Sequence, residues 1–132
     1  MKKLIFLILM LAGGLCYGQN ISSTVIGGAK TVSLAADNTV TFYSPNSYYW
    51  SFQFVWSGAN ATDAKVYTQV SNDGVNFVNY PVADSVSIAA ASGNVILRDA
   101  TTGTTERYLR FNVVHGTNTV GTLVITGNAV KK

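Results

Sequence analysis

The sequence predicts an all-β protein, a single antiparallel β-sandwich of about eight strands. Apolar and polar residues alternate through most of the chain, which is the spacing of strands that bury one face. Clusters of Gly, Asn, Asp, Ser and Pro separate these stretches at turn spacings of roughly 8–12 residues. No stretch keeps helical spacing over three turns.

Eight stretches carry the strand pattern, in the order 39–43, 50–57, 65–71, 75–80, 85–89, 94–97, 107–114 and 119–126. β-Branched and aromatic residues, which strands favour, dominate these stretches. In the second stretch, Trp50, Phe52, Phe54 and Trp56 occupy alternate positions. We expect this row of rings to be buried against an opposite sheet, because such a row left in water would promote aggregation.

Turn residues and the ends of the pattern set the expected boundaries. Asn72-Asp73-Gly74 separates the third and fourth stretches and predicts a hairpin, because Gly and Asn tolerate positive φ. Residues 19–30 are small and polar, so we expect a flexible lead-in there that is either loose or paired along a sheet edge. We place the β-sandwich domain at residues 31–128 and a frayed C-terminus at residues 129–132.

The N-terminus has the order of a secretory signal peptide. Lys2 and Lys3 precede an apolar run over residues 4–12, and small residues follow. We expect cleavage after Gly18, which removes residues 1–18 and exports the protein to the periplasm, the cell surface or the medium. The first alternative is an uncleaved anchor, although the run is short for a membrane span.

Cys16 provides a second alternative, a lipoprotein that is cut before this cysteine. Leu15 stands where that signal needs a small residue, so we expect a lipid anchor less than simple release. With cleavage after Gly18, no membrane span remains in the mature chain.

Removal of residues 1–18 leaves 114 residues, which is enough for one core. Seven Lys and Arg then stand against six Asp and Glu, a net charge of +1. A field this weak favours no nucleic-acid partner. No cysteine remains, so no disulfide staples the domain and no thiolate can bind metal.

No catalytic or metal-binding cluster is visible in the residues. His115 is the single histidine, whereas tetrahedral zinc needs several ligands. The strained G-x-S-x-G turn of serine hydrolases is absent. We therefore expect no enzyme activity and no cofactor. A carboxylate pair and a loop calcium ion stay as alternatives, which rest on the acids Asp37, Asp63, Asp73, Asp84, Asp99 and Glu106.

The tyrosines are the more informative residues. They lie at strand ends or opposite the core positions, namely at Tyr43, Tyr48, Tyr49, Tyr67, Tyr80 and Tyr108. Rings on an exposed sheet can stack on sugars or anchor a protein partner, or they can simply cover sheet edges. Arg110 shares a strand face with Tyr108 and could stack on a ring or pair with Glu106. The candidate ligand-binding residues are Tyr43, Tyr48, Tyr49, Tyr67, Tyr108 and Arg110.

Three short motifs occur in order along the chain: QVSNDGVNF at residues 69–77, YLRF at 108–111 and GTL at 121–123. Over residues 31–126 the pattern resembles the small jelly-roll sandwiches of tailed-phage virion and tail-fibre proteins. It is also similar to discoidin-like and carbohydrate-binding modules of secreted bacterial proteins. The resemblance implies a jelly-roll-like sandwich. No binding residue is carried over, because Phe77 replaces a frequent tryptophan of discoidin-like domains and their terminal cysteine pair is absent.

The sequence therefore predicts a non-enzymatic, exported β-sandwich that acts as an adhesion or binding module. Its expected partner is a glycan or a surface protein. The alternative is a structural or decoration protein of a virion or a surface assembly, in which copies of the chain associate with one another.

Overall fold

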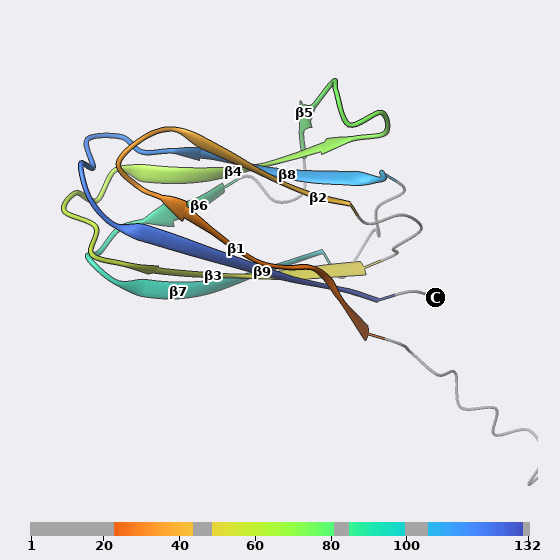
Figure 1. Cartoon of the computed structure of the whole chain (residues 1–132), viewed down its shortest axis with the longest axis horizontal. Helices are drawn as coiled ribbons and strands as arrows, with labels where there is room; N and C mark the ends of the chain where they lie inside the picture. The colour runs from red at the N-terminus through yellow and green to blue at the C-terminus, as the bar shows by residue number, and fades with distance from the viewer. Residues whose placement is uncertain (1–22, 44–48, 81–84, 100–105, 131–132) are drawn as a thin grey trace, which may run out of the picture.

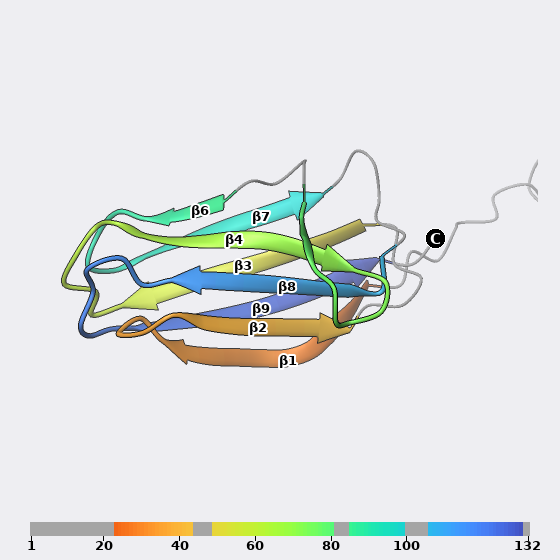
Figure 2. The same cartoon turned by 90° about the horizontal axis from the view of Figure 1, so that it is seen from above.

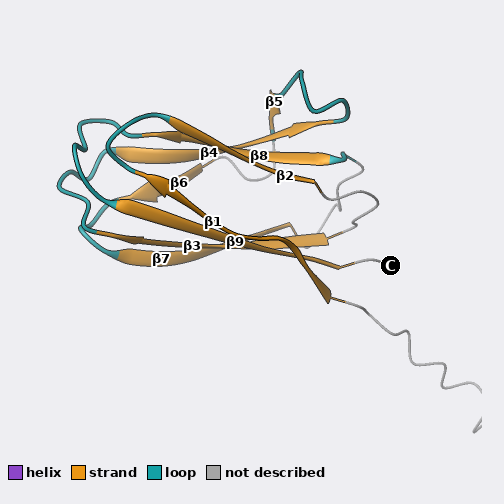
Figure 3. Cartoon of the chain, in the orientation of Figure 1, coloured by secondary structure: helices purple, strands orange, loops and turns teal. Residues whose placement is uncertain are grey.

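The computed structural model describes residues 23–43, 49–80, 85–99 and 106–130. The expected signal peptide, residues 1–18, lies outside these ranges. Within them the chain forms strands and loops without any helix (Figure 3). The described strands are β1 (Ser23–Ser33), β2 (Asn38–Tyr43), β3 (Tyr49–Ser57), β4 (Ala64–Ser71), β5 (Val78–Asn79), β6 (Ser85–Ile88), β7 (Gly93–Asp99), β8 (Tyr108–Val114) and β9 (Thr122–Val130). A helix able to cross a membrane is not found among the described residues.

The strands form two antiparallel sheets that pack face to face (Figure 1). Sheet A has the order β1-β9-β3-β7, and sheet B has the order β2-β8-β4-β5, with β6 also paired to β4. Apart from the short β5, the chain changes sheet at every connection except the one from β4 to β6. This is the arrangement of a jelly roll, so the predicted all-β, jelly-roll-like sandwich is confirmed.

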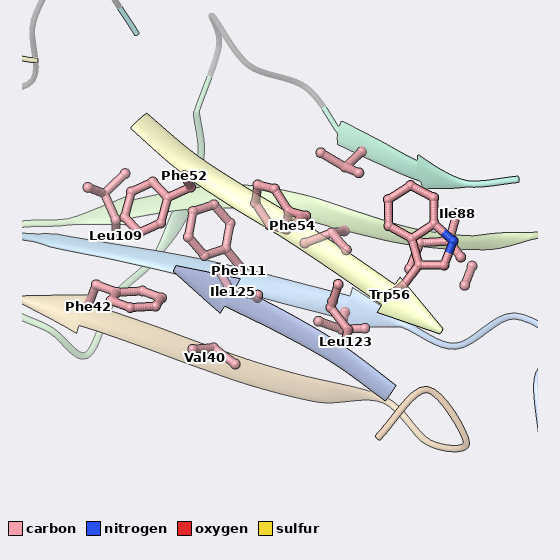
Figure 4. Packing of buried hydrophobic residues seen from close by; sticks show 14 of the residues in the cluster. Val40, Phe42, Phe52, Phe54, Trp56, Ile88, Leu109, Phe111, Leu123 and Ile125 are labelled. Atoms are coloured by element: carbon pink, nitrogen blue, oxygen red, sulfur yellow. The ribbon is translucent and has the colours of Figure 1, made fainter. Parts of the chain in front are cut away.

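The core lies between the two sheets, where the inward residues of the long strands meet (Figure 4). Trp50, Phe52 and Phe54 of β3 are almost fully buried, as is Trp56. The ring centroid of Phe111 on β8 lies 4.6 Å from that of Phe52 and 5.1 Å from that of Phe54, both edge to face. Each such pair contributes about 0.5–1.5 kcal/mol beyond the buried area. The expectation that the β3 rings face the core is therefore confirmed.

The described sandwich spans residues 23–130 and not the expected 31–128. β1 begins within the expected lead-in and pairs with β9 along the edge of sheet A, so edge pairing is the observed alternative. The register shifts between Ile26 and Lys30, where Gly27 and Gly28 have φ of 67° and 69°. This bulge interrupts the alternation of side chains, which is why the sequence pattern concealed the strand.

The fourth expected strand, at residues 75–80, is mostly a loop, and only β5 pairs with β4. The Asp73 carboxylate accepts hydrogen bonds from the amides of Val75 and Asn76, both at 2.8 Å. Side-chain acceptors of this kind compete with strand pairing. The hairpin predicted at Asn72-Asp73-Gly74 therefore exists with a longer loop and a shorter second strand.

Side chains tie the loops together at the other end of the sandwich. The buried Asn118 accepts hydrogen bonds from the amides of Asn60 and Ala61, at 3.1 and 2.9 Å. The amide of Thr119 donates in turn to the Asn60 side chain at 3.0 Å. Because this contact engages Thr119, the last strand begins at Thr122 and not at residue 119 as expected.

Candidate functional site

The outer face of sheet B gathers most of the outward aromatic side chains. Buried and outward positions alternate along most of β2, β4 and β8. Tyr43, Tyr67, Tyr108 and Arg110 therefore project from the same side of the sheet. We call this surface, the outer side of β2, β8, β4, β5 and β6, the tyrosine face.

Tyr43 and Tyr108 form one end of the tyrosine face. They are cross-strand partners, and their ring centroids lie 5.1 Å apart at an angle of 47°. Tyr43 is 55% exposed, whereas Tyr108 is only partly exposed. A Cβ built on Gly74 would lie 3.1 Å from the Tyr108 ring, so the β4–β5 loop (residues 72–77) packs directly on that ring. Figure 2 shows this loop crossing over β8.

Hydrogen bonds within the β4–β5 loop hold its shape. The Asp73 carboxylate accepts the two amide hydrogen bonds from Val75 and Asn76 and a third from the Asn76 side chain at 2.8 Å. The Ser71 hydroxyl donates to the same carboxylate at 2.7 Å and accepts from the Gly74 amide at 3.0 Å. These bonds, led by that from Val75, hold the pKa of Asp73 well below its usual value. The loop is thus a preorganised wall at one end of the tyrosine face.

Arg110 lies between the rings and is held from two directions. Its Cζ lies 3.9 Å from the centroid of the Phe77 ring. Its Nε donates to Gln69 Oε1 at 2.8 Å, and Gln69 Nε2 donates to Asn79 Oδ1 at 3.1 Å. The terminal nitrogens of Arg110 find no acceptor among the described residues. The guanidinium plane is therefore oriented while its terminal N–H groups stay available to a ligand.

The rest of the tyrosine face is polar. Tyr67 lies between Asn112 and Ser85 in the cross-strand register. The outward polar side chains of this face are Thr39, Thr41, Lys65, Gln69, Asn79, Ser85, Ser87 and Asn112. A sugar can place its C–H face on an aromatic ring while its hydroxyls bond to amide and hydroxyl groups. The composition of the tyrosine face suits that kind of ligand.

The structure brings together four of the six candidate residues, Tyr43, Tyr67, Tyr108 and Arg110. Tyr49 does not join them, because it opens β3 on the outer face of sheet A. Tyr48 lies outside the described residues. For Arg110, the structure shows stacking on a ring, and no ion pair with Glu106 occurs among the described side chains.

The expectation that Tyr80 points outward is wrong. Tyr80 is 6% exposed, and its ring lies 5.8 Å from that of Trp50 in the core. The amide of Tyr80 donates to the Thr68 carbonyl at 2.9 Å and so continues the pairing of β5. Tyr80 thereby has the inward parity of Val78, which pairs with the buried Val70.

Phe77, Gln69 and Asn79 are the site residues that the sequence reasoning missed. All three contribute to the network around Arg110. A signal was present, because Phe77 and Asn79 stand two residues apart and so share one face of an extended chain. That signal could not be used without knowing that β4 and β8 are neighbours.

His115 has a structural setting at the end of the sandwich. Its Nδ1 lies 2.6 Å from Asp37 Oδ1, and its amide donates to the same carboxylate oxygen at 2.9 Å. These hydrogen bonds, led by that from the ring, lower the pKa of Asp37. Within the described ranges, no group of three or more His, Cys, Asp and Glu side chains is placed to hold a metal ion.

The chain matches no protein-family model and no sequence of a curated protein. It is similar in structure to a carbohydrate-binding module of family 4, with 12% identity and a TM-score of 0.51, covering 87% of this chain and 81% of that one. The K1 cleaved adhesin domain of Lys-gingipain from Porphyromonas gingivalis W83 gives 11% identity and a TM-score of 0.52, covering 88% and 86%. A carbohydrate-binding module of family 29 gives 13% identity and a TM-score of 0.48, covering 84% and 89%.

At these identities the similarity shows a shared fold. The resemblance to carbohydrate-binding modules is thus confirmed for the β-sandwich architecture. The resemblance to phage virion proteins and to discoidin-like domains stays a prediction.

Proposed function

We propose that this chain is a non-enzymatic, exported binding module that holds a glycan on the tyrosine face. The observation that carries the proposal is the grouping of Tyr43, Tyr67 and Arg110 with amide and hydroxyl side chains on one outer face of the sandwich. Carbohydrate-binding modules use the same fold, so the sandwich can present such a face. Export, to the periplasm or the cell surface, rests on the signal-like residues 1–18.

The spacing of the rings favours a chain of sugars over a single sugar. Tyr43 and Tyr67 lie two strands apart and four residues apart along the strands. Ordinary strand geometry gives a separation of roughly 16 Å between their backbones. Arg110 and Phe77 lie between the two tyrosines. An oligosaccharide that follows this diagonal can stack on a ring at each end, whereas a monosaccharide reaches one ring at most.

Affinity gel electrophoresis against a panel of soluble polysaccharides tests the proposal. Tyr67→Ala and Tyr43→Ala should each weaken binding about tenfold, as expected for the loss of an aromatic contact that contributes about 1–2 kcal/mol. Tyr49→Ala is the matched control, because it removes a partly exposed tyrosine from the other sheet. The control should bind like the unchanged protein.

Two results would contradict the proposal. One is equal weakening by Tyr49→Ala, which would remove any special role of the tyrosine face. The other is failure to bind any polysaccharide in the panel. If that failure came with concentration-dependent oligomers in size-exclusion chromatography with light scattering, it would favour the surface-assembly alternative.

A further inference from the structure

The charged side chains at outward positions of the tyrosine face are both cationic. They are Arg110 on β8 and Lys65 on β4, and neither pairs with a carboxylate in the described part of the chain. The nearby Asp73 has its carboxylate occupied by hydrogen bonds within the loop. The face therefore carries positive charge that no described carboxylate neutralises.

The geometry of Arg110 suits a carboxylate more than a hydroxyl. Packing on Phe77 and the hydrogen bond to Gln69 orient the guanidinium before any ligand arrives. The terminal N–H groups of an arginine form a fork that matches both oxygens of a carboxylate, and such charge-assisted bonds are about twice as strong as neutral ones. Because the side chain is already ordered, less entropy is lost on binding.

We propose that the glycan held on the tyrosine face is acidic, and that Arg110 binds the carboxylate of one of its uronic-acid sugars. This inference rests on the proposed function. Lys65 lies one strand away from Arg110 and four residues along the sheet. That offset corresponds to roughly 14 Å between the backbones. Lys65 can therefore approach a second acidic sugar of the same polymer, and Tyr67 lies between Lys65 and Gln69 on β4.

The test compares acidic polysaccharides with their own neutral forms. Polygalacturonate, alginate and hyaluronan are each run beside the carboxyl-reduced polymer in affinity gel electrophoresis at physiological salt. At least one acidic form should bind about tenfold or more tighter than its reduced counterpart. Arg110→Gln should abolish this preference, and Arg110→Lys, which keeps the charge without the fork, should lose part of it.

Arg98→Gln is the matched control, because Arg98 is exposed on β7 at the outer face of sheet A. It removes the same charge from the other side of the sandwich and should leave the preference unchanged. Thermal unfolding by circular dichroism shows whether each variant is folded. Arg110→Lys serves as the second variant if Arg110→Gln is not.

Three outcomes would overturn the inference. Equal binding of acidic and reduced forms, both weakened by Tyr67→Ala, would exclude an acidic ligand and leave the proposed function standing. Equal weakening by Arg98→Gln and Arg110→Gln would mark the preference as general attraction to a polyanion. Absence of binding to any polysaccharide would overturn the inference together with the proposed function.

Discussion

The two outer faces of the sandwich differ in chemistry although they cover the same core. The tyrosine face carries three tyrosines, the Arg110 network and the β4–β5 loop. The outer face of sheet A is mostly small, hydroxylated or aliphatic at its outward positions on β3, β7 and β9, which are Tyr49, Ser51, Gln53, Val55, Ser57, Asn94, Ile96, Arg98, Thr122, Val124, Thr126 and Asn128.

Outward positions contribute little to the core, so the fold does not dictate which rings they carry. The side chains that hold the sheets together lie at the alternate, inward positions of the same strands. A cluster of tyrosines with an oriented arginine on one face therefore needs another explanation, and ligand binding provides one. The comparison of the two faces can be broken or sharpened by four changes.

The largest effect should come from Phe111→Ala, which removes the ring that joins β8 to Phe52 and Phe54 of the opposite sheet. We expect the free energy of unfolding to fall by about 3–5 kcal/mol, and both faces to lose their order together. Urea denaturation measures this loss. Val114→Ala, on the outer side of the same strand, should change stability by less than about 1 kcal/mol. Similar losses for the two variants would contradict the assigned core.

A matched pair of glycine substitutions separates backbone strain from the loop contact. Gly74 and Gly28 have φ of 75° and 69°, so alanine should cost about 1–2 kcal/mol of stability at either position. A Cβ on Gly74 meets the Tyr108 ring, whereas one on Gly28 meets nothing within 4 Å. Gly74→Ala alone should therefore also weaken glycan binding. Equal binding by the two variants would show that the loop does not shape the site.

Acid should weaken the fold through carboxylates whose pKa values are lowered. Hydrogen bonds depress the pKa of Asp73, Asp37 and Asp63 in the folded state. A depressed pKa adds stability above the unfolded-state value near 3.8, and that stability is lost as the pH falls below about 4. Melting temperatures measured from pH 6 down to pH 2 should decline most steeply at the acid end. A melting temperature that stays level to pH 2 would contradict this assignment.

The smallest effect should come from Asp73→Asn, which keeps an acceptor oxygen but removes the charge. At neutral pH we expect a modest loss of stability, because neutral hydrogen bonds are weaker than charge-assisted ones. The acid-dependent decline should also become shallower than in the unchanged protein. An unaltered pH profile would show that Asp73 contributes nothing to acid sensitivity.

The sequence predicted the core better than the ends of the elements. Alternation alone placed the β3 rings inside and gave Tyr67, Tyr108 and Arg110 their outward positions. It failed where a local interaction overrides the period of two. The glycine bulge hid β1, and the Asp73 carboxylate withdrew two amides from the strand that residues 75–80 were expected to form.

The grouping of site residues could not be predicted, because strand order is not contained in alternation. Tyr43 and Tyr49 are six residues apart and both outward, yet the chain crosses from sheet B to sheet A between β2 and β3. They therefore lie on opposite sides of the sandwich. Arg110 and Gln69 are 41 residues apart in sequence and hydrogen-bonded in the fold, because β4 and β8 are neighbours.

The central claim, that the ligand lies on the tyrosine face, is tested most directly by NMR. The isotope-labelled protein is titrated with an oligosaccharide cut from whichever polysaccharide it binds. The account predicts that the largest chemical-shift changes occur at Tyr67, Arg110 and Asn112, with little change at Gln53 and Val124 of sheet A. Changes centred on Gln53 and Val124, with Tyr67 and Arg110 unaffected, would contradict it.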